Sequence, residues 1–420
     1  MTSLSYLQRL VIILTLVGCT HVCYAQAPGN ISSNLQLWLK TNAGTSTTTD
    51  GSTVTTWNDQ SGNSANVTAG NTPSYQSNTI NYNPSILYES TDRHTVNTPS
   101  IEAQNTTIYF VGKPGNGGGY GLCEGWVTNA GGTGNDIPIY LRNGYKFTYF
   151  DDNPWNFYET SLTWSQNESS LARAELSNAS NYNASYSKLG GTAATLTSVN
   201  GSVNTPHNYY TTLGNWPTDD YVEPFGYIAE TIIYNTASQS STEKNKIETY
   251  LAVKYGLTLD NAAGGTAGDY TSSAGTLLWD ASAVSTYHYD LTGIGRDDNS
   301  ALGQVKSKSE NSDGILTIYA DGEGTNASNS FVDIANNEWM LCGNNNGAAT
   351  FSTTGAPASY RILARQWHVE ETGDVGNCSF WFNIQNSSFN VPVGFGDIYY
   401  LLHDSDNDNS LSDETLSRPN

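Results

Sequence analysis

The segment GYIAETIIYN, residues 226–235, is the strongest β-strand signal in the first half of the chain. β-branched and aromatic side chains fill it, and such residues suit the pleated surface of a sheet. The period then changes, because residues 240–243 have the S-x-x-E form of a capping box and apolar residues recur at helical spacing from residue 247. We predict a helix over 242–255, stopped by glycine, with its apolar stripe on the rim of the sheet.

Upstream of this strand the chain repeats short strands between turns. Turn sequences rich in Gly, Asp, Asn and Ser separate short apolar stretches at 35–39, 54–57 and 107–111. Many short strands without intervening helices predict a sandwich or jelly roll. We expect this first domain to span residues 26–256.

A second series of strands follows the predicted helix. Residues 257–270 are rich in Gly, Ala and Thr, which is typical of a linker. Further strand-like stretches lie at 277–279, 315–319, 338–341, 362–369, 380–384 and 398–402. They predict a second β-rich domain over 271–420. The expected fold class is therefore all-β: a jelly-roll sandwich with one closing helix, then a second β-sandwich-like domain.

The charge balance excludes some classes of partner. Asp and Glu outnumber Lys and Arg by 39 to 17, which gives a formal net charge of −22. Such an acidic chain repels phosphate backbones and anionic lipid heads, so we expect neither nucleic acid nor a membrane surface as its partner. Aromatic residues make up 11% of the chain, which favours a folded protein over a disordered one.

The first 25 residues predict an export signal. Arg9 supplies the positive flank, residues 10–17 are the apolar core, and residues 23–25 offer a small-residue cleavage site. The apolar run is too short to span a membrane. We expect a secreted or cell-surface protein. The alternative is an outer-membrane lipoprotein, because residues 16–19 also have the form of a lipoprotein signal that would be lipidated on Cys19.

The remaining cysteines are too few for a disulfide framework. Cleavage would leave Cys123, Cys342 and Cys378, an odd number spread along the chain. Cys342 and Cys378 would be able to pair if their strands are neighbours, and the alternative is three small buried side chains.

Several motifs resemble a known family. The first half resembles the laminin G-like or concanavalin A-like jelly roll of large Bacteroidota surface proteins, in the motifs LWLK (37–40), WNDQSGN (57–63) and 226–235. The helix ending YLAVKYGLTL (250–259) resembles the end of that module. The second half is similar to an uncharacterised β-rich domain that follows it, in the motifs GIGRDD (293–298) and RQWHVE (365–370).

This resemblance implies a concanavalin A-like fold and a place at the cell surface, but no particular chemistry. Such proteins often end in a sorting module, whereas this chain stops after an acidic turn, so we expect a short protein or a fragment of a longer one. Structural roles are expected for the polar and aromatic residues of these motifs. We expect Trp57 to fill the sandwich core, Asn58 and Asp59 to hold a turn through side-chain hydrogen bonds, and Arg296 to pair with Asp297 or Asp298.

An acidic segment near the end of the chain predicts a calcium site. Residues 404–414, DSDNDNSLSDE, place oxygen side chains at the first, third and fifth positions of a calcium-type loop. Asn409 replaces the usual glycine and Thr415 the usual Glu, so Asp413 or Glu414 would have to substitute. The candidate ligands are Asp404, Asp406, Asp408, Ser410 and Asp413. The alternative is a solvated acidic turn.

Glu230 is the one candidate catalytic acid. Concanavalin A-like folds also carry glycoside hydrolases, which need two carboxylates flanking the sugar bond. Strict alternation would place Ile228, Ile232 and Tyr234 on the face of Glu230, which leaves it without an acidic partner. A strand glutamate held by hydrogen bonds is the favoured interpretation.

Sugar binding requires less: an aromatic platform and a few polar partners, usually on loops. The candidate residues are Trp155, Asp152, Tyr210, Trp216 and Asp219, although any one of these tryptophans also fits a rim-packing role. We therefore expect an adhesion or binding protein that recognises glycans or another surface protein. The alternatives are a glycan hydrolase using Glu230, and spacer domains of a larger surface protein.

Overall fold

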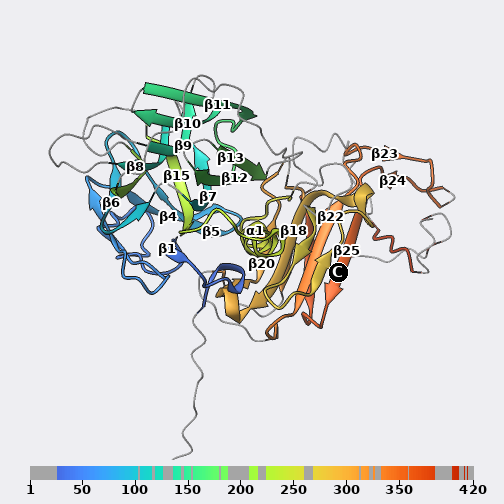
Figure 1. The fold of residues 1–420 in the computed structure, drawn as a ribbon. Helices are drawn as coiled ribbons and strands as arrows, with labels where there is room; N and C mark the ends of the chain where they lie inside the picture. Colours follow the sequence, from blue (N-terminus) through green and yellow to red (C-terminus); the bar gives the residue numbers. More distant parts are fainter. Residues whose placement is uncertain are drawn as a thin grey trace, which may run out of the picture.

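The computed structural model describes residues 26–102, 105–115, 119–125, 136–142, 146–152, 155–178, 181–187, 208–215, 224–259, 268–311, 314–320, 325–326, 333–357, 359–383, 400–405, 411 and 414. Within these residues the fold is all-β, as predicted. Two β-rich bodies lie side by side and meet at one α-helix (Figure 1). No helix of this described part is long and apolar enough to cross a membrane.

The first body is an antiparallel two-sheet sandwich. One sheet has the order β13 (Asn181–Ser187), β12 (Ser170–Asn178), β7 (Thr106–Pro114), β15 (Gly226–Tyr234), β5 (Asn83–Leu87) and β4 (Ser74–Ile80), with β1 (Leu35–Lys40) also paired to β15. The other has the order β11 (Trp155–Thr163), β10 (Lys146–Asp152), β9 (Asp136–Arg142), β8 (Gly119–Gly125), β14 (Asn208–Leu213), β6 (Arg93–Glu102), β3 (Val67–Gly70) and β2 (Thr56–Trp57). Trp57 and Trp164 are fully buried between the sheets.

Trp57, Asp59 and Arg296 have the structural roles that their sequence predicts, whereas Asn58 bonds to its turn through its main chain. Trp57 is a core residue, and its Nε1 donates to the Lys40 carbonyl at 3.0 Å. Asp59 ties its turn by accepting from the backbone N–H groups of Trp38 and Ser61, each at 2.9 Å. Arg296 pairs with Asp298, with its Nε 2.7 Å from Asp298 Oδ1.

A β-bulge in β15 changes which side chains share a face. The ladder between β15 and β7 shifts register between Ile228 and Glu230, which makes Ala229 the extra residue. An extra residue reverses the inside–outside alternation of a strand. The prediction that Ile228 shares the face of Glu230 is therefore wrong: Ile228 packs in the sandwich core, whereas Ile232 and Tyr234 lie on the other face with Glu230.

The helix α1 (Ser241–Tyr255) forms where the capping box predicts it. Ser240 Oγ accepts from the Glu243 N–H at 3.2 Å, and the Glu243 carboxylate accepts from the Ser240 N–H at 2.8 Å. Gly256 ends the helix with φ of 62°, and a Cβ there would lie 2.2 Å from the Lys308 carbonyl oxygen. Glycine is therefore needed at this position for both its backbone angle and its close contact with the second body.

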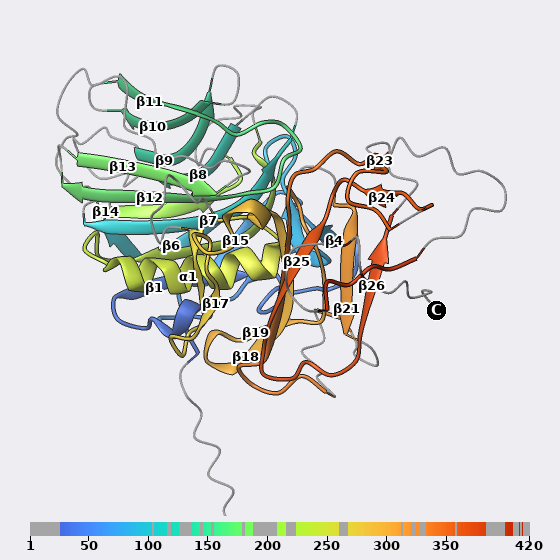
Figure 2. The ribbon, with the colours of Figure 1, turned by 90° about the vertical axis from the view of Figure 1, so that its right-hand side faces the viewer.

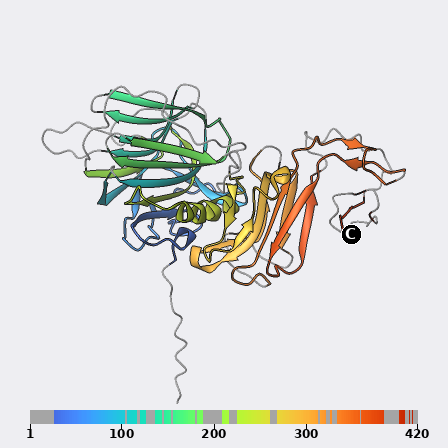
Figure 3. The ribbon, with the colours of Figure 1, turned by 45° about the vertical axis from the view of Figure 1, so that its right-hand side comes forward.

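The environment of α1 differs from the predicted sheet rim. Its C-terminal half is buried nearly all round, including Thr249 and Lys254, because the helix lies between the two bodies (Figure 3). It shares one apolar cluster with Trp38 of β1 and with Trp279 and Trp339 of the second body. The helix thus joins two domains instead of covering the end of one.

The second body is also a sandwich, which confirms the predicted fold of this half. One sheet has the order β19 (Leu302–Gln304), β18 (Tyr289–Asp297), β22 (Trp339–Asn344) and β25 (Trp367–Thr372); the other has the order β20 (Lys306–Lys308), β21 (Leu316–Ala320) and β26 (Cys378–Phe382). Two hairpins complete it: β16 (Tyr270–Thr271) with β17 (Leu277–Trp279), and β23 (Phe351–Ser352) with β24 (Ile362–Leu363). Short 3-10 turns occur at η1 (Pro28–Asn30), η4 (Ser285–Tyr287) and η5 (Asp298–Ser300). Cys342 is buried in this core, and the partly buried Cys378 packs against it without forming a disulfide to Cys342.

The start of the predicted linker is packed between the bodies. Leu257 and Leu259 are buried, and Tyr270 Oη donates to the Leu257 carbonyl at 2.7 Å and accepts from the Leu259 N–H at 3.0 Å. Residues 260–267 of the predicted linker lie outside the described residues. The two domains therefore share one core across their interface.

A buried carboxylate holds α1 against the first body. Glu230 Oε1 accepts from Trp38 Nε1 at 2.6 Å and from Tyr250 Oη at 2.8 Å. Its Oε2 accepts from Lys254 Nζ at 2.7 Å and from Tyr255 Oη at 2.8 Å. Glu230 is 1% exposed, so these four donors replace its water. We call these five residues the Glu230 cluster.

Replacing Glu230 by Gln should lower the free energy of unfolding by about 3–5 kcal/mol, because Lys254 would be left buried without its counter-ion. The matched control is Asp298→Asn, which breaks an exposed pair and should cost less than about 1 kcal/mol. Chemical denaturation of both variants measures the difference. Equal small losses would show that the cluster does not stabilise the fold.

His94 predicts a pH dependence of stability. It is buried in β6, where its ring nitrogens lie 2.8 Å from Tyr88 Oη and 2.9 Å from the Val54 carbonyl. Burial lowers the pKa of His94 to about 4, although the hydrogen bond to Val54 opposes this. His94 thus becomes protonated near pH 6.5 in the unfolded chain but only near pH 4 in the folded chain. Above pH 6.5 His94 is neutral in both states and does not affect the pH dependence of stability. As the pH drops from 6.5 to 4, the free energy of unfolding should fall by up to about 3 kcal/mol.

Unfolding midpoints between pH 4 and pH 7, compared with those of His94→Gln, measure this effect. The variant keeps a side chain able to bond Tyr88 and Val54 but has nothing to titrate, so its stability should depend less on pH. Burial also lowers the pKa of His288, which leaves some dependence in the variant. Identical slopes for the two proteins would rule out His94 as the source.

Candidate functional site

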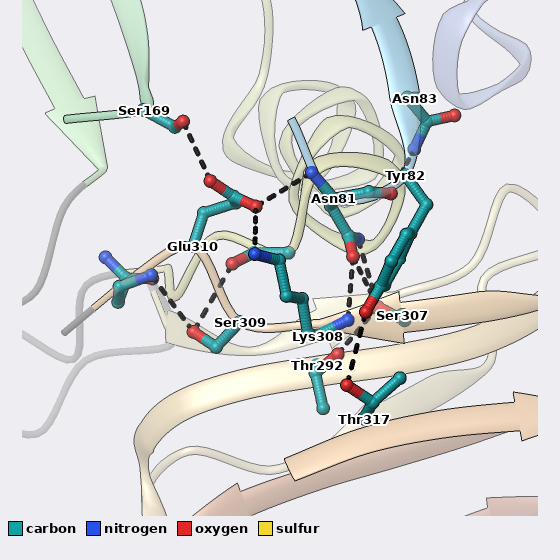
Figure 4. Close-up of polar contacts among 12 residues, drawn as sticks. Asn81, Tyr82, Asn83, Ser169, Thr292, Ser307, Lys308, Ser309, Glu310 and Thr317 are labelled. Atoms are coloured by element: carbon teal, nitrogen blue, oxygen red, sulfur yellow. Dashed lines mark hydrogen bonds and ion pairs between the residues drawn. The ribbon is translucent and has the colours of Figure 1, made fainter. Parts of the chain in front are cut away.

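The turn between β4 and β5 inserts into the second domain. Asn81 and Tyr82 at its tip both have positive φ, 47° and 59°, as a two-residue hairpin turn of type I′ requires. Asn is favoured at such positions, whereas a tyrosine there is uncommon and must be held by its surroundings. Figure 4 shows this turn between the end of α1 and strand β20.

The Asn81 side chain is buried and binds both neighbours. Its Oδ1 accepts from the Lys308 N–H at 2.7 Å, and its Nδ2 donates to the Lys254 carbonyl at 3.1 Å and to Ser307 Oγ at 3.0 Å. Asn83 Nδ2 adds a bond to the same Lys254 carbonyl at 2.6 Å. The turn therefore bonds to the helix and to β20 together.

Glu310 closes the interface from the second domain. Its Oε1 accepts from the Asn81 N–H at 2.9 Å, and its Oε2 accepts from Ser169 Oγ, beside β12, at 3.1 Å (Figure 4). Lys308 Nζ lies 3.6 Å from Oε1. These directed bonds fix the relative position of the two domains.

This interface brings Tyr82 beside the outer face of the β20–β21–β26 sheet. In the register of that sheet, Lys306 lies opposite Tyr319, and Thr317 lies between Lys308 on one side and Trp381 on the other. Residues opposite each other share a face. Strands β21 and β26 lie side by side in Figure 2. We call this surface the platform; it consists of Tyr82, Lys306, Lys308, Thr317, Tyr319 and Trp381.

Lys306, the first residue of β20, lies among three rings of the platform. Lys306 Nζ is 4.4 Å from the ring centre of Tyr82, 5.6 Å from that of Trp381 and 5.8 Å from that of Tyr319. The Tyr319 and Trp381 rings are 6.3 Å apart with their planes inclined at 39°. Tyr82 Oη and Thr317 Oγ1 are 3.3 Å apart. Cation–π attraction therefore orders a lysine on an open surface.

The exposure of Trp381 sets the platform apart from the core. Its side chain is 60% exposed, while Trp38, Trp57, Trp164, Trp279 and Trp339 are almost completely buried. Exposed aromatic faces next to polar donors mark binding surfaces. The platform residues supply stacking faces, ammonium groups and hydroxyls, but no carboxylate, so they provide binding chemistry and no acid–base pair.

The sequence-predicted sugar-binding residues lie elsewhere. Asp152 and Trp155 are register partners at the end of the β10–β11 hairpin. Tyr210 lies on β14, opposite Gly125, and strands β8 and β9 separate it from β10. Trp216 and Asp219 lie outside the described residues. The structure thus places Asp152 beside Trp155 but keeps Tyr210 apart from both.

The predicted calcium loop is described only in part. Glu414 accepts from the N–H and the Oγ of Ser405, each at 2.8 Å. Asp404 is described as well, but Asp406, Asp408, Ser410 and Asp413 lie outside the described residues. Among the residues that the structure does describe, no three metal-binding side chains gather. The calcium site stays a prediction.

Glu230, the predicted catalytic alternative, is in the buried cluster between β15 and α1. Both of its oxygens accept from protein donors, so its geometry fits the structural interpretation and gives a substrate no access.

Sequence reasoning missed the platform. Alternation in β21 places Thr317 and Tyr319 on one face, which is a local signal. Their meeting with Trp381 and Tyr82 depends on strand register and on a hairpin far away in the chain.

The comparisons cover the second half of the chain most directly. Residues 243–419 match a domain of unknown function (DUF8202), which is less than half of the chain. The match begins inside α1, so this family model groups the helix with the second domain. No curated protein sequence matches the chain.

Solved structures show distant likenesses. Domain 4 of an extracellular arabinanase from Geobacillus stearothermophilus, in complex with arabinotriose, is 16% identical with a TM-score of 0.36; the match covers 51% of this chain and 98% of that one. A Trypanosoma rangeli sialidase in complex with sialic acid is 10% identical with a TM-score of 0.32; the match covers 51% of this chain and 32% of that one. The botulinum neurotoxin serotype D binding domain is 13% identical with a TM-score of 0.33; the match covers 79% of this chain and 70% of that one. Likenesses this distant assign no function.

Asn81→Ala should weaken the docking of the two domains. It removes buried bonds to Lys308, Lys254 and Ser307 and forces alanine into a positive φ, so we expect a loss of about 3 kcal/mol and separate unfolding transitions. Asn71→Ala is the control, because Asn71 also has positive φ, 69°, but lies on an exposed turn. Calorimetry measures both variants. A single transition at an unchanged temperature for Asn81→Ala would contradict the docking role.

Proposed function

We propose that this protein is an exported glycan-binding protein and that it holds sugars on the platform. The observation that carries the proposal is the 60% exposed indole of Trp381 beside Tyr319 on one sheet face, with Lys306 and Thr317 next to them. A pyranose presents an apolar C–H face and a rim of hydroxyls. An aromatic ring accepts the first, and ammonium and hydroxyl groups bond to the second.

The size and chemistry of the platform favour a glycan over a protein partner. A stable protein interface needs about 800 Å² on each side, with an apolar centre. The platform offers three exposed or half-exposed rings, two on a short three-stranded sheet and Tyr82 beside it, together with Lys and Thr side chains. Such a surface suits two or three sugar units.

The hydrolase and spacer alternatives receive less support. Hydrolysis needs two carboxylates on either side of the bond, whereas the platform holds none and Glu230 is buried beneath α1. A pure spacer has no use for an exposed tryptophan held beside an ordered lysine. Binding is the function that uses every member of the platform.

An extracellular location completes the proposal. The predicted export signal over 1–25 and the resemblance of the first half to laminin G-like surface modules of Bacteroidota support it. We propose a secreted or cell-surface protein in which the jelly roll positions Tyr82 while the second domain provides the rest of the platform.

Trp381→Ala should weaken glycan binding at least about tenfold, which corresponds to about 1.4 kcal/mol, because it removes the main stacking face. The matched control is Tyr360→Ala, since Tyr360 is 42% exposed but lies outside the platform. A glycan array identifies ligands for the wild type, and calorimetry with the best of them compares the variants.

Both substitutions are at exposed positions, so melting temperatures should change little and a loss of binding would report on the site. The proposal fails if the wild type binds no glycan, or if Trp381→Ala and Tyr360→Ala bind equally well.

A further inference from the structure

We infer that the platform selects glycans that carry an isolated acidic sugar, whose carboxylate binds between Lys306 and Lys308. This inference rests on the proposed glycan-binding function and specifies its ligand class. The two lysines stand two residues apart on β20, both on the outer face of the sheet.

The charge of the platform is opposite to that of the whole chain. Lys306 forms no ion pair with any described carboxylate; the three rings around it are neutral. Lys308 forms an ion pair with Glu310 at 3.6 Å, and its side chain is 40% exposed, so ammonium N–H groups of Lys308 stay open to solvent. One ammonium group without a described counter-ion, that of Lys306, therefore lies beside the partly exposed Lys308 on a chain whose formal net charge is −22.

The position of Lys306 is prepared for an anion. Cation–π contacts to Tyr82, Trp381 and Tyr319 hold its Nζ, and none of these rings is an anion that would neutralise it. An ammonium group has three such donors, and a carboxylate accepts them strongly. Because the side chain is ordered before the ligand arrives, less rotamer entropy is lost on binding than for a free lysine.

The geometry connects this charge to the stacking face. Lys306 Nζ is 5.6 Å from the Trp381 ring centre, comparable to the width of one pyranose ring. A sugar stacked on the indole would therefore bring its exocyclic carboxylate to Lys306. The Thr317 hydroxyl, on the strand between Lys308 and Trp381, lies within reach of a ring hydroxyl.

The net negative charge of the chain favours a ligand with few negative charges over a densely charged polyanion. Screening in physiological salt limits exposed charges to about 8 Å, so a single carboxylate interacts mainly with the two lysines. A densely charged polymer would extend over the acidic surface of the −22 chain and be repelled. The ligand class is thus a glycan with one carboxylated sugar among neutral ones.

The test is an array of matched oligosaccharide pairs that differ only by a uronic acid in place of the neutral hexose, together with sialylated and asialo pairs. The wild type should prefer the acidic member of the pairs it binds by at least tenfold. Raising NaCl from 0.1 to 1 M should weaken its binding to the acidic member and leave the neutral member nearly unchanged.

Variants locate the effect. Lys306→Gln should abolish the preference while keeping weak binding to both members, and Lys306→Arg should keep most of it. Lys146→Gln is the control, because the Lys146 side chain is 46% exposed and lies outside the platform. Equal binding of acidic and neutral members, or an unchanged preference in Lys306→Gln, would overturn the inference.

These failures differ from failure of the proposed function. Neutral binding that Trp381→Ala abolishes would keep the glycan function and remove the acidic selectivity. Binding of no pair at all, or binding that Trp381→Ala leaves intact, would remove both.

Discussion

The buried carboxylate of Glu230 is the constraint on which the arrangement of the two domains depends. It binds Trp38 of the first sheet and three side chains of α1, one of which is the ammonium of Lys254. The main-chain carbonyl of Lys254 accepts in turn from Asn81 and Asn83. Asn81 then binds the Lys308 N–H of β20. Hydrogen bonds on the side chain and on the main chain of Lys254 thus link the outer face of the β15 sheet, through α1, to the platform.

Burying a charge costs desolvation free energy, so the Glu230 cluster contributes more to fixing the position of the helix than to net stability. A buried ion pair often contributes little more than apolar packing would, whereas breaking it leaves an uncompensated charge. Apolar contacts between α1 and β15 alone would tolerate a rotation or slide of the helix. Four donors aimed at one carboxylate allow only one position, and the positions of Gly256 and the Asn81 turn follow from it.

This rigidity gives the proposed site its character. Tyr82 comes from the jelly roll, while Lys306, Tyr319 and Trp381 come from the second domain, so the platform exists only while the domains are docked. The local charge of the platform comes from the few side chains that meet there, and these include Lys306 and Lys308. A locally basic, aromatic face on an acidic chain is therefore compatible with selective binding of a weakly charged glycan.

Local features of this protein follow from short stretches of its sequence, and contacts between distant stretches do not. The capping box at Ser240, the glycine stop at Gly256 and the strand at 226–235 involve bonds or side-chain periods within a few residues, so pattern alone predicts them. The bulge at Ala229, the burial of α1 and the joining of Tyr82 to Trp381 depend on which strands pair and in which register. Register is chosen by the packing of the whole fold, and a one-residue shift exchanges the inner and outer faces of a strand. For that reason the fold class was predictable from the chain, whereas the platform, which joins residues almost three hundred positions apart, emerges only once both domains have packed against α1.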